Sequence, residues 1–192
     1  MIAPQPNIGV TRYLVDKSAS TFLARAFASG MLSALGHSPT IAIRDFTSEA
    51  SLDPDSLESV SLRIEIRADS LEVMDDISAK DRREMESTMN EKVLESAKYP
   101  TILFQSDRAS ATKLGGGRFK AVVDGTLSLR GTAGKIAVPT QVTLIGDMLR
   151  ASGEFSILQS SYGIPLVSVA GGALKLKDEV KFTFDIVARM QE

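Results

Sequence analysis

The chain lacks cysteine and tryptophan, and it has a single histidine, His37. Without cysteine it can form no disulfide, no thiolate-ligated metal site and no thiol nucleophile. One histidine cannot supply a site that needs two imidazoles. The 22 basic and 24 acidic side chains give a net charge of −2, so the basic excess typical of nucleic-acid-binding proteins is missing. These absences exclude zinc fingers, cysteine-ligated iron–sulfur clusters and sites built from two imidazoles, and they argue against a nucleic-acid partner.

Long hydrophobic runs are also absent. No segment approaches the roughly 18 uninterrupted apolar residues that a membrane-spanning helix needs. Residues 1–7 (MIAPQPN) have neither the basic start nor the apolar stretch of a secretory signal. We therefore expect no membrane span and a cytoplasmic protein, or a periplasmic one if a longer precursor was trimmed.

The composition that remains is that of a compact globular protein. Hydrophobic residues make up 43% of the 192 residues and charged residues 24%. A chain of this size buries about 70% of its unfolded surface, which is enough for a sizeable core. Residues 1–10 contain Pro4 and Pro6 and are expected to form a flexible arm. We predict one domain over residues 11–192.

Alternation of apolar and polar residues is the strongest pattern in the sequence. It is clearest in Ser59–Asp69, Arg118–Arg130 and Glu179–Arg189, and it predicts strands with one apolar and one wet face. Such strands are typical of antiparallel sheets. Weaker alternation predicts strands at Thr11–Asp16, Thr21–Ala28, Thr40–Phe46, Glu49–Leu52, Thr101–Ala109, Ile136–Ile145, Met148–Phe155 and Ala173–Leu176.

Many short strands separated by turn residues predict an all-β sandwich or barrel. An eight-stranded barrel has an interior just wide enough for side chains or for one small ligand. Closure would also remove exposed sheet edges. The pattern alone leaves open whether such a barrel is hollow or filled.

Two segments are predicted to be helical. Ser78–Ser96 has no glycine or proline, and Met85, Met89 and Val93 recur at a spacing of four residues. This spacing predicts a helix that packs over a barrel opening with these three side chains inward. A second, shorter helix is predicted at Gly30–Leu35.

Several motifs resemble the YceI-like family. Lys98–Ser106 (KYPTILFQS) and Asp124–Thr132 (DGTLSLRGT) resemble two strand segments of that family, and Gln159–Ile164 (QSSYGI) is similar to one of its turns. The order and spacing hold from about Tyr13 to the C-terminus. The resemblance implies an all-β, extended eight-stranded antiparallel lipocalin-like β-barrel, capped by one or two helices. It also implies a long interior that holds polyisoprenoids or other long-chain amphiphiles, and many members are exported to the periplasm.

From this resemblance and the apolar inward faces we expect a non-enzymatic binding protein, without cofactor, metal or catalytic residues. Its partner would be a long-chain apolar small molecule, an isoprenoid or fatty-acid derivative that the protein sequesters or transports. A homodimer stays open as an assembly state. The expected ligand-binding residues are His37, Phe104, Phe119, Phe155, Phe182 and Phe184.

Two other functions remain open at this point. One is an enzyme that acts on an amphiphile with His37 and a nearby carboxylate as acid and base. The other is a filled barrel that serves as an interaction scaffold. The binding protein and the enzyme both require an internal cavity, whereas the scaffold does not. His37 also has a simpler interpretation, as a loop histidine hydrogen-bonded to nearby backbone.

Overall fold

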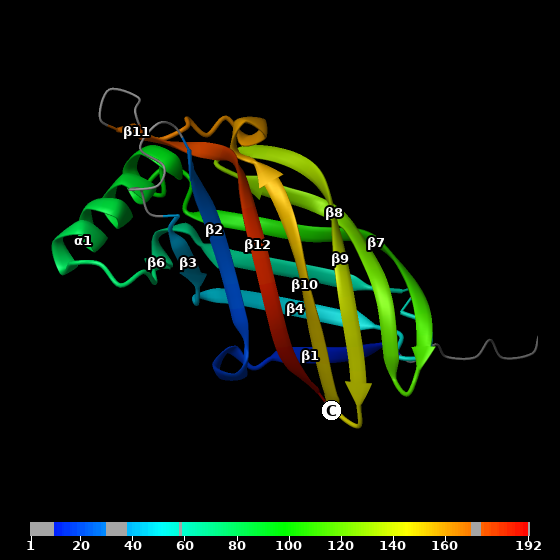
Figure 1. Cartoon of the computed structure of the whole chain (residues 1–192). Helices are drawn as coiled ribbons and strands as arrows, with labels where there is room; N and C mark the ends of the chain where they lie inside the picture. The colour runs from blue at the N-terminus through cyan, green and yellow to red at the C-terminus, as the bar shows by residue number, and fades with distance from the viewer. Residues whose placement is uncertain (1–9, 30–37, 58, 170–173, 192) are drawn as a thin grey trace, which may run out of the picture.

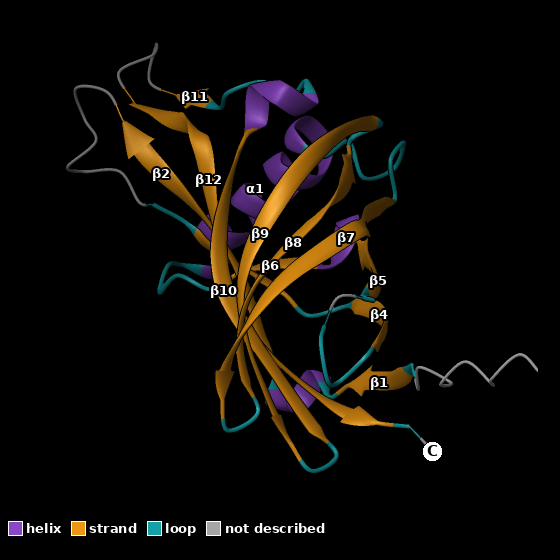
Figure 2. Cartoon of the chain, turned by 90° about the vertical axis from the view of Figure 1, so that its right-hand side faces the viewer, coloured by secondary structure: helices purple, strands orange, loops and turns teal. Residues whose placement is uncertain are grey.

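The computed structural model describes residues 10–29, 38–57, 59–169 and 174–191. Their strands form one antiparallel sheet that closes into a barrel, because β1 pairs with β12 (Figures 1 and 2). In order around the ring, the eight strands are β1 (Thr11–Val15), β4 (Phe46–Leu52), β5 (Ser61–Arg67), β7 (Thr101–Gly115), β8 (Arg118–Leu129), β9 (Thr132–Ile145), β10 (Met148–Leu158) and β12 (Leu174–Met190). The predicted fold class is confirmed.

Three further strands extend this ring beyond β12. They are β2 (Thr21–Ser29), β3 (Thr40–Ile43) and β6 (Leu71–Val73), and a two-residue strand, β11 (Ser168–Val169), pairs with the start of β12. Along one edge of β12, Val15 of β1 pairs with Ala188 and Phe22 of β2 pairs with Phe184. β1 and β2 are therefore two halves of one long strand.

The same division is repeated in the next two strands of the sheet. β3 pairs with β2 and β4 with β1, while β6 pairs with β3 and β5 with β4. The breaks lie at a 3₁₀ turn over Lys17–Ala19, at residues 44–45 and at a 3₁₀ turn over Ala68–Ser70. Three neighbouring strands thus break side by side.

Polar groups satisfy the backbone at these breaks. The Asp16 carboxylate accepts the backbone N–H groups of Ser18 and Ala19, and the Ser20 hydroxyl accepts the N–H of Val187. The Asp45 carboxylate lies 3.8 Å from Lys17 Nζ and 3.1 Å from Arg67 Nη1. The breaks are therefore held in register by contacts between one strand and the next.

The helix fills the place of a missing half-strand. α1 (Ala79–Thr88) continues as a π-helical segment, Met89–Val93, which together confirm the helix predicted within Ser78–Ser96. The Ser78 hydroxyl accepts the N–H of Asp81 at 3.1 Å, which caps the N-terminus. β7 pairs with β5 but not with β6, and α1 lies beside β6 (Figure 1). The second predicted helix, Gly30–Leu35, lies outside the described residues.

The predicted alternation is confirmed in β5, β8 and β12, whose apolar side chains face the barrel interior. In β8 every second residue from Phe119 to Leu129 is buried. Two strand predictions need correction. The predicted strand Thr40–Phe46 is divided between β3 and β4, because the sheet breaks at Arg44 and Asp45. The predicted strand Ala173–Leu176 is not a strand of its own, because β12 already begins at Leu174.

The interior contains two apolar clusters, one towards each end of the barrel. We call the end at which α1 lies the open end, and the end with the β7–β8 and β9–β10 hairpins the closed end (Figure 2). At the closed end Tyr13, Leu52, Leu57, Phe119 and Leu149 pack together and are almost fully buried. The larger cluster joins the ring strands to Met89 and Leu94 of the helical segment.

Gly125 allows the Phe104 ring to lie against β8. A Cβ atom at this position would approach the Phe104 ring to 2.5 Å and the Gln105 carbonyl oxygen to 2.6 Å, so both would have to move. Such overpacking of a core costs about 1–3 kcal/mol.

We therefore predict that Gly125→Ala lowers the free energy of unfolding by about 1–3 kcal/mol, measured by urea denaturation. Thr126→Ala is the matched control, because Thr126 is the next residue of β8 and its hydroxyl only accepts a bond from the exposed Lys135 ammonium. The control substitution should lower the free energy of unfolding by less than about 1 kcal/mol. Equal losses in the two variants would show that Gly125 is not needed for this contact.

Candidate ligand cavity

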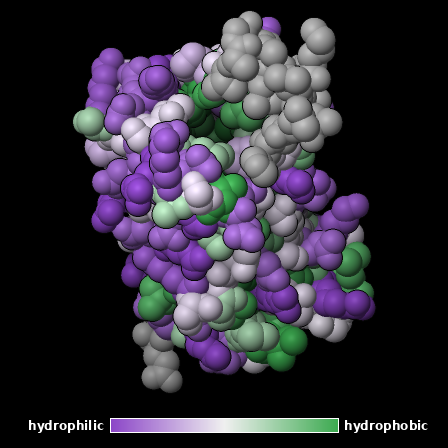
Figure 3. Space-filling view, turned by 60° about the vertical axis from the view of Figure 1, so that its left-hand side comes forward, coloured by the Kyte–Doolittle hydropathy of each residue, from purple (hydrophilic) through white to green (hydrophobic). Residues whose placement is uncertain are grey.

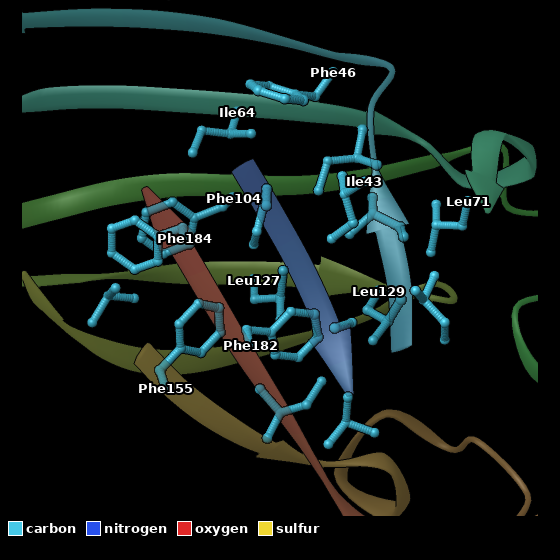
Figure 4. Close-up of a pocket in the computed structure, with 18 of the residues that line it drawn as sticks. Ile43, Phe46, Ile64, Leu71, Phe104, Leu127, Leu129, Phe155, Phe182 and Phe184 are labelled. Carbon is cyan, nitrogen blue, oxygen red and sulfur yellow. The ribbon is translucent and has the colours of Figure 1, made fainter. Parts of the chain in front are cut away.

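The barrel encloses a cavity of about 610 Å³, within the range of about 300–1,000 Å³ for small-molecule sites. Its wall is almost entirely apolar and comes from all eight ring strands, from β2, β3 and β6, and from α1. Figure 4 shows apolar side chains of this wall pointing into the cavity. Besides phenylalanines, the wall includes Ile43, Ile64, Leu71, Leu127 and Leu129. The barrel therefore encloses an apolar cavity and is not filled by its own side chains.

Phenylalanine rings form one region of this wall. Phe155 and Phe182 stack with ring centroids 4.9 Å apart and an interplanar angle of 9°. Phe22 makes edge or tilted contacts with Phe46, Phe182 and Phe184 at 6.3 to 6.5 Å between centroids. These contacts hold the rings in fixed orientations around the empty space.

The structure brings most of the predicted site residues together. Phe104, Phe155, Phe182 and Phe184 all line the cavity. Phe119 is not part of the wall; its ring is buried in the cluster that fills the closed end. His37 lies outside the described residues.

The closed end is sealed by the loop between β4 and β5. Leu57 is 2% exposed and adopts a positive φ of 55°, with its N–H bonded to the Asp53 carbonyl oxygen at 2.9 Å. The Asp53 carboxylate accepts the Asp55 N–H and the Ser56 hydroxyl, and these bonds lower the pKa of Asp53. The loop is thus shaped to insert one leucine between the strands.

The open end is the mouth of the cavity. Figure 3 shows a hydrophobic hollow near the top of the molecule, on the side where α1 lies. From α1, Asp81, Glu84, Met85 and Thr88 line the cavity, and Gln159 does so from the 3₁₀ turn Gln159–Tyr162 that follows β10. Met85, Met89 and Val93 all face the cavity, as the four-residue spacing predicted.

Side chains of α1 satisfy the free edge of β6. The Glu86 carboxylate accepts the Val73 N–H at 3.0 Å, and the Arg82 guanidinium donates to the carbonyl oxygens of Val73 at 3.0 Å and Asp75 at 2.9 Å. At the other end of the helical segment, the Arg130 guanidinium donates to the Glu95 carboxylate and to the Gly163 carbonyl oxygen. The helix is therefore fixed at both ends.

Two ionisable groups near the open end have shifted pKa values. Bonds from the Ser160 hydroxyl and backbone N–H lower the pKa of Asp178 and join the turn after β10 to β12. Burial raises the pKa of Tyr162, whose ring packs beside Gly134. Both groups therefore keep their ordinary charge state near neutral pH.

No group of three or more His, Asp or Glu side chains in the described ranges could hold a metal ion. Of the helices in the described part of the chain, none is long and apolar enough to cross a membrane. The chemistry that this site offers is burial of apolar surface, with a few polar groups at its mouth.

Asp81, Glu84 and Gln159 line the cavity but were not among the ligand-binding residues predicted from the sequence. Asp81 could have been found, because it lies four residues before Met85 and so shares the face of Met85, Met89 and Val93. Gln159 carried no such signal, because its position follows from how β10 ends against β12.

A family model described as YceI-like domain matches residues 13–188. BcnA of Burkholderia cenocepacia is 20% identical, with a TM-score of 0.69 over 90% of this chain and 98% of that one. A polyisoprenoid binding domain from Saccharophagus degradans is 15% identical, with a TM-score of 0.64 over 93% of this chain and 98% of that one. The YCEI protein of Campylobacter jejuni is 16% identical, with a TM-score of 0.59 over 79% and 85%. No curated protein matches the chain.

We predict that Glu86→Ala lowers the free energy of unfolding by about 1–3 kcal/mol, because the Val73 N–H, in a residue 2% exposed, loses its acceptor. Glu86→Gln keeps a carbonyl acceptor in the same place and should recover most of the loss. Urea denaturation measures both changes. If the alanine and glutamine variants lost the same stability, the bond to Val73 would not be the cause.

Proposed function

The chain belongs to the YceI-like domain family, and from this premise we propose that it is a non-enzymatic binding protein for a long apolar amphiphile. The amphiphile would be a polyisoprenoid or a fatty-acid derivative, which the barrel sequesters or transports. The observation that carries the proposal is the cavity of about 610 Å³, whose wall is almost entirely apolar. A fold neighbour described as a polyisoprenoid binding domain supports the same class of ligand.

The chemistry of the wall suits a hydrocarbon chain. Burial of each methylene group contributes about 0.8 kcal/mol, so ten methylenes would contribute about 8 kcal/mol before ordering costs. A micromolar dissociation constant corresponds to about 8 kcal/mol, so a chain longer than ten methylenes can offset ordering costs and bind without any strong polar contact. The phenylalanine cluster adds rigid apolar surface that needs little ordering when the ligand enters.

The shape of the cavity favours one orientation of the ligand. Leu57 and its neighbours fill the closed end, whereas α1 and the turn after β10 border a mouth with polar side chains. An apolar chain would therefore insert towards Leu57 and leave its polar head at the open end. The presence of this cavity argues against the alternative function, a filled barrel that serves only as an interaction scaffold.

Titration with a fluorescent long-chain acyl or prenyl probe tests this function. We predict saturable binding to the wild-type protein and at least about tenfold weaker binding to Phe182→Lys, because the new ammonium group would be buried in an apolar wall. His37→Ala should change the affinity about fivefold or less, because one hydrogen bond is worth about 1 kcal/mol.

Thr183→Lys is the matched control for Phe182→Lys. Thr183 is the next residue of β12, is exposed on the outer surface and pairs with Glu154, so the added charge lies outside the cavity. It should bind the probe like the wild type. Ile64→Trp fills part of the cavity without adding charge and should also weaken binding. Absence of saturable binding, or equal affinity in every variant, would contradict the proposal.

The homodimer and the cytoplasmic or periplasmic location stay predictions. They would decide where and in what assembly the ligand is carried, and the binding function proposed for the cavity does not depend on either.

A further inference from the structure

We propose that the cavity selects an amphiphile whose head donates hydrogen bonds and carries no negative charge, such as an alcohol or an amine. It would discriminate against phosphate and carboxylate heads on the same hydrocarbon chain. This inference rests on the proposed binding function and adds the chemistry of the head group.

The charged side chains that line the described part of the cavity are both acidic. Among the described residues that line the cavity, Asp81 and Glu84 are the only charged ones. The basic side chains of α1, which are Lys80, Arg82 and Arg83, do not line the cavity. Arg82 donates to the carbonyl oxygens of Val73 and Asp75, and the exposed Lys80 forms an ion pair with Glu84 at 3.9 Å.

Gln159 supplies an independent sign of the same preference. Its side chain lines the cavity, and the residue is only 4% exposed. Its Nε2 atom donates to the Lys177 carbonyl oxygen at 2.9 Å, which fixes the orientation of the amide. No described residue donates a hydrogen bond to its Oε1 atom, so this acceptor is available to a ligand in the cavity.

A second buried acceptor lies deeper in the wall. Thr140 is 8% exposed and lines the cavity, and its hydroxyl donates its proton to the Val138 carbonyl oxygen at 3.1 Å. The lone pairs of that hydroxyl oxygen are what it can offer to a ligand. A head group at the open end can reach Gln159 but not this deeper hydroxyl, so the preference for a donor on the head rests on Gln159.

Gln159 and α1 lie at the same end of the barrel. The turn that begins with Gln159 follows the end of β10, and its neighbours Tyr162 and Ile164 belong to the same apolar cluster as Met89 and Leu94 of the helical segment (Figure 1). A head group at the mouth therefore meets two carboxylates, an amide oxygen and the Thr88 hydroxyl. The carboxylates would repel an anionic head, and the amide oxygen could donate no hydrogen bond to it.

A series of ligands with one hydrocarbon chain and different heads tests the inference. Geranylgeraniol, geranylgeranylamine and geranylgeranyl phosphate each compete against a fluorescent prenyl probe. We expect the alcohol and the amine to compete at least about tenfold better than the phosphate. Glu84→Lys should reduce that ratio by strengthening phosphate and weakening amine binding, and Gln159→Met should weaken the alcohol most.

Glu91→Lys is the matched control for charge. Glu91 lies in the same helical segment, is exposed, and is absent from the cavity wall. Its substitution by lysine therefore changes the net charge as much as Glu84→Lys does, without altering the mouth. It should leave the order of the three ligands unchanged. Equal or tighter binding of the phosphate by the wild type, or equal effects of Glu84→Lys and Glu91→Lys, would overturn the inference. Failure of all three ligands to compete would refute the binding function, and the inference with it.

Discussion

Pairing of β12 with two successive half-strands determines how the barrel can be hollow at one end and packed at the other. The Asp16 N–H donates to the Val187 carbonyl oxygen and the Ser20 hydroxyl accepts the Val187 N–H, so β12 keeps its hydrogen bonds where its partner strand breaks. On one side of the break, β1 closes the eight-stranded ring. On the other side, β2, β3 and β6 continue without reaching β7, and the interior has room for a cavity. Satisfied backbone at the break is therefore what permits the change in packing.

The gap between β6 and β7 explains the role of the helical segment. A bare strand edge beside an apolar cavity would leave backbone groups unpaired. Arg82 and Glu86 pair with that edge from one face of α1, while Met85, Met89 and Val93 present apolar surface to the cavity. One amphipathic helix thus supplies hydrogen-bond partners to the edge of β6 and also forms part of the cavity wall. Because it is also bonded to Arg130 through Glu95, it forms a fixed part of the wall.

The distribution of polar groups in the cavity gives it a direction. The end sealed by Leu57 is apolar, whereas Asp81, Glu84 and Gln159 all lie at the mouth. Hydrocarbon burial supplies affinity whatever the head group, because it is proportional to the apolar area removed from water. Selectivity has to come from the few polar groups, and the two charged ones in the described part of the wall are both acidic. Affinity and selectivity therefore reside in different parts of one cavity.

The sequence by itself determined the strands, the inward faces of β5, β8 and β12, and the helix with its methionine face, because these follow from local periodicity and from the motifs shared with the family. It could not separate Phe119 from Phe182, since both stand on the apolar face of an alternating strand. Phe119 fills the closed end and Phe182 lines the cavity, and that difference depends on how far along the barrel each residue lies. The depth of a residue along the barrel is set by the stagger of the strands, by the break they share and by ring closure. All three depend on contacts between residues that are distant in the chain. Only the tertiary structure decided which apolar side chains fill space and which surround it.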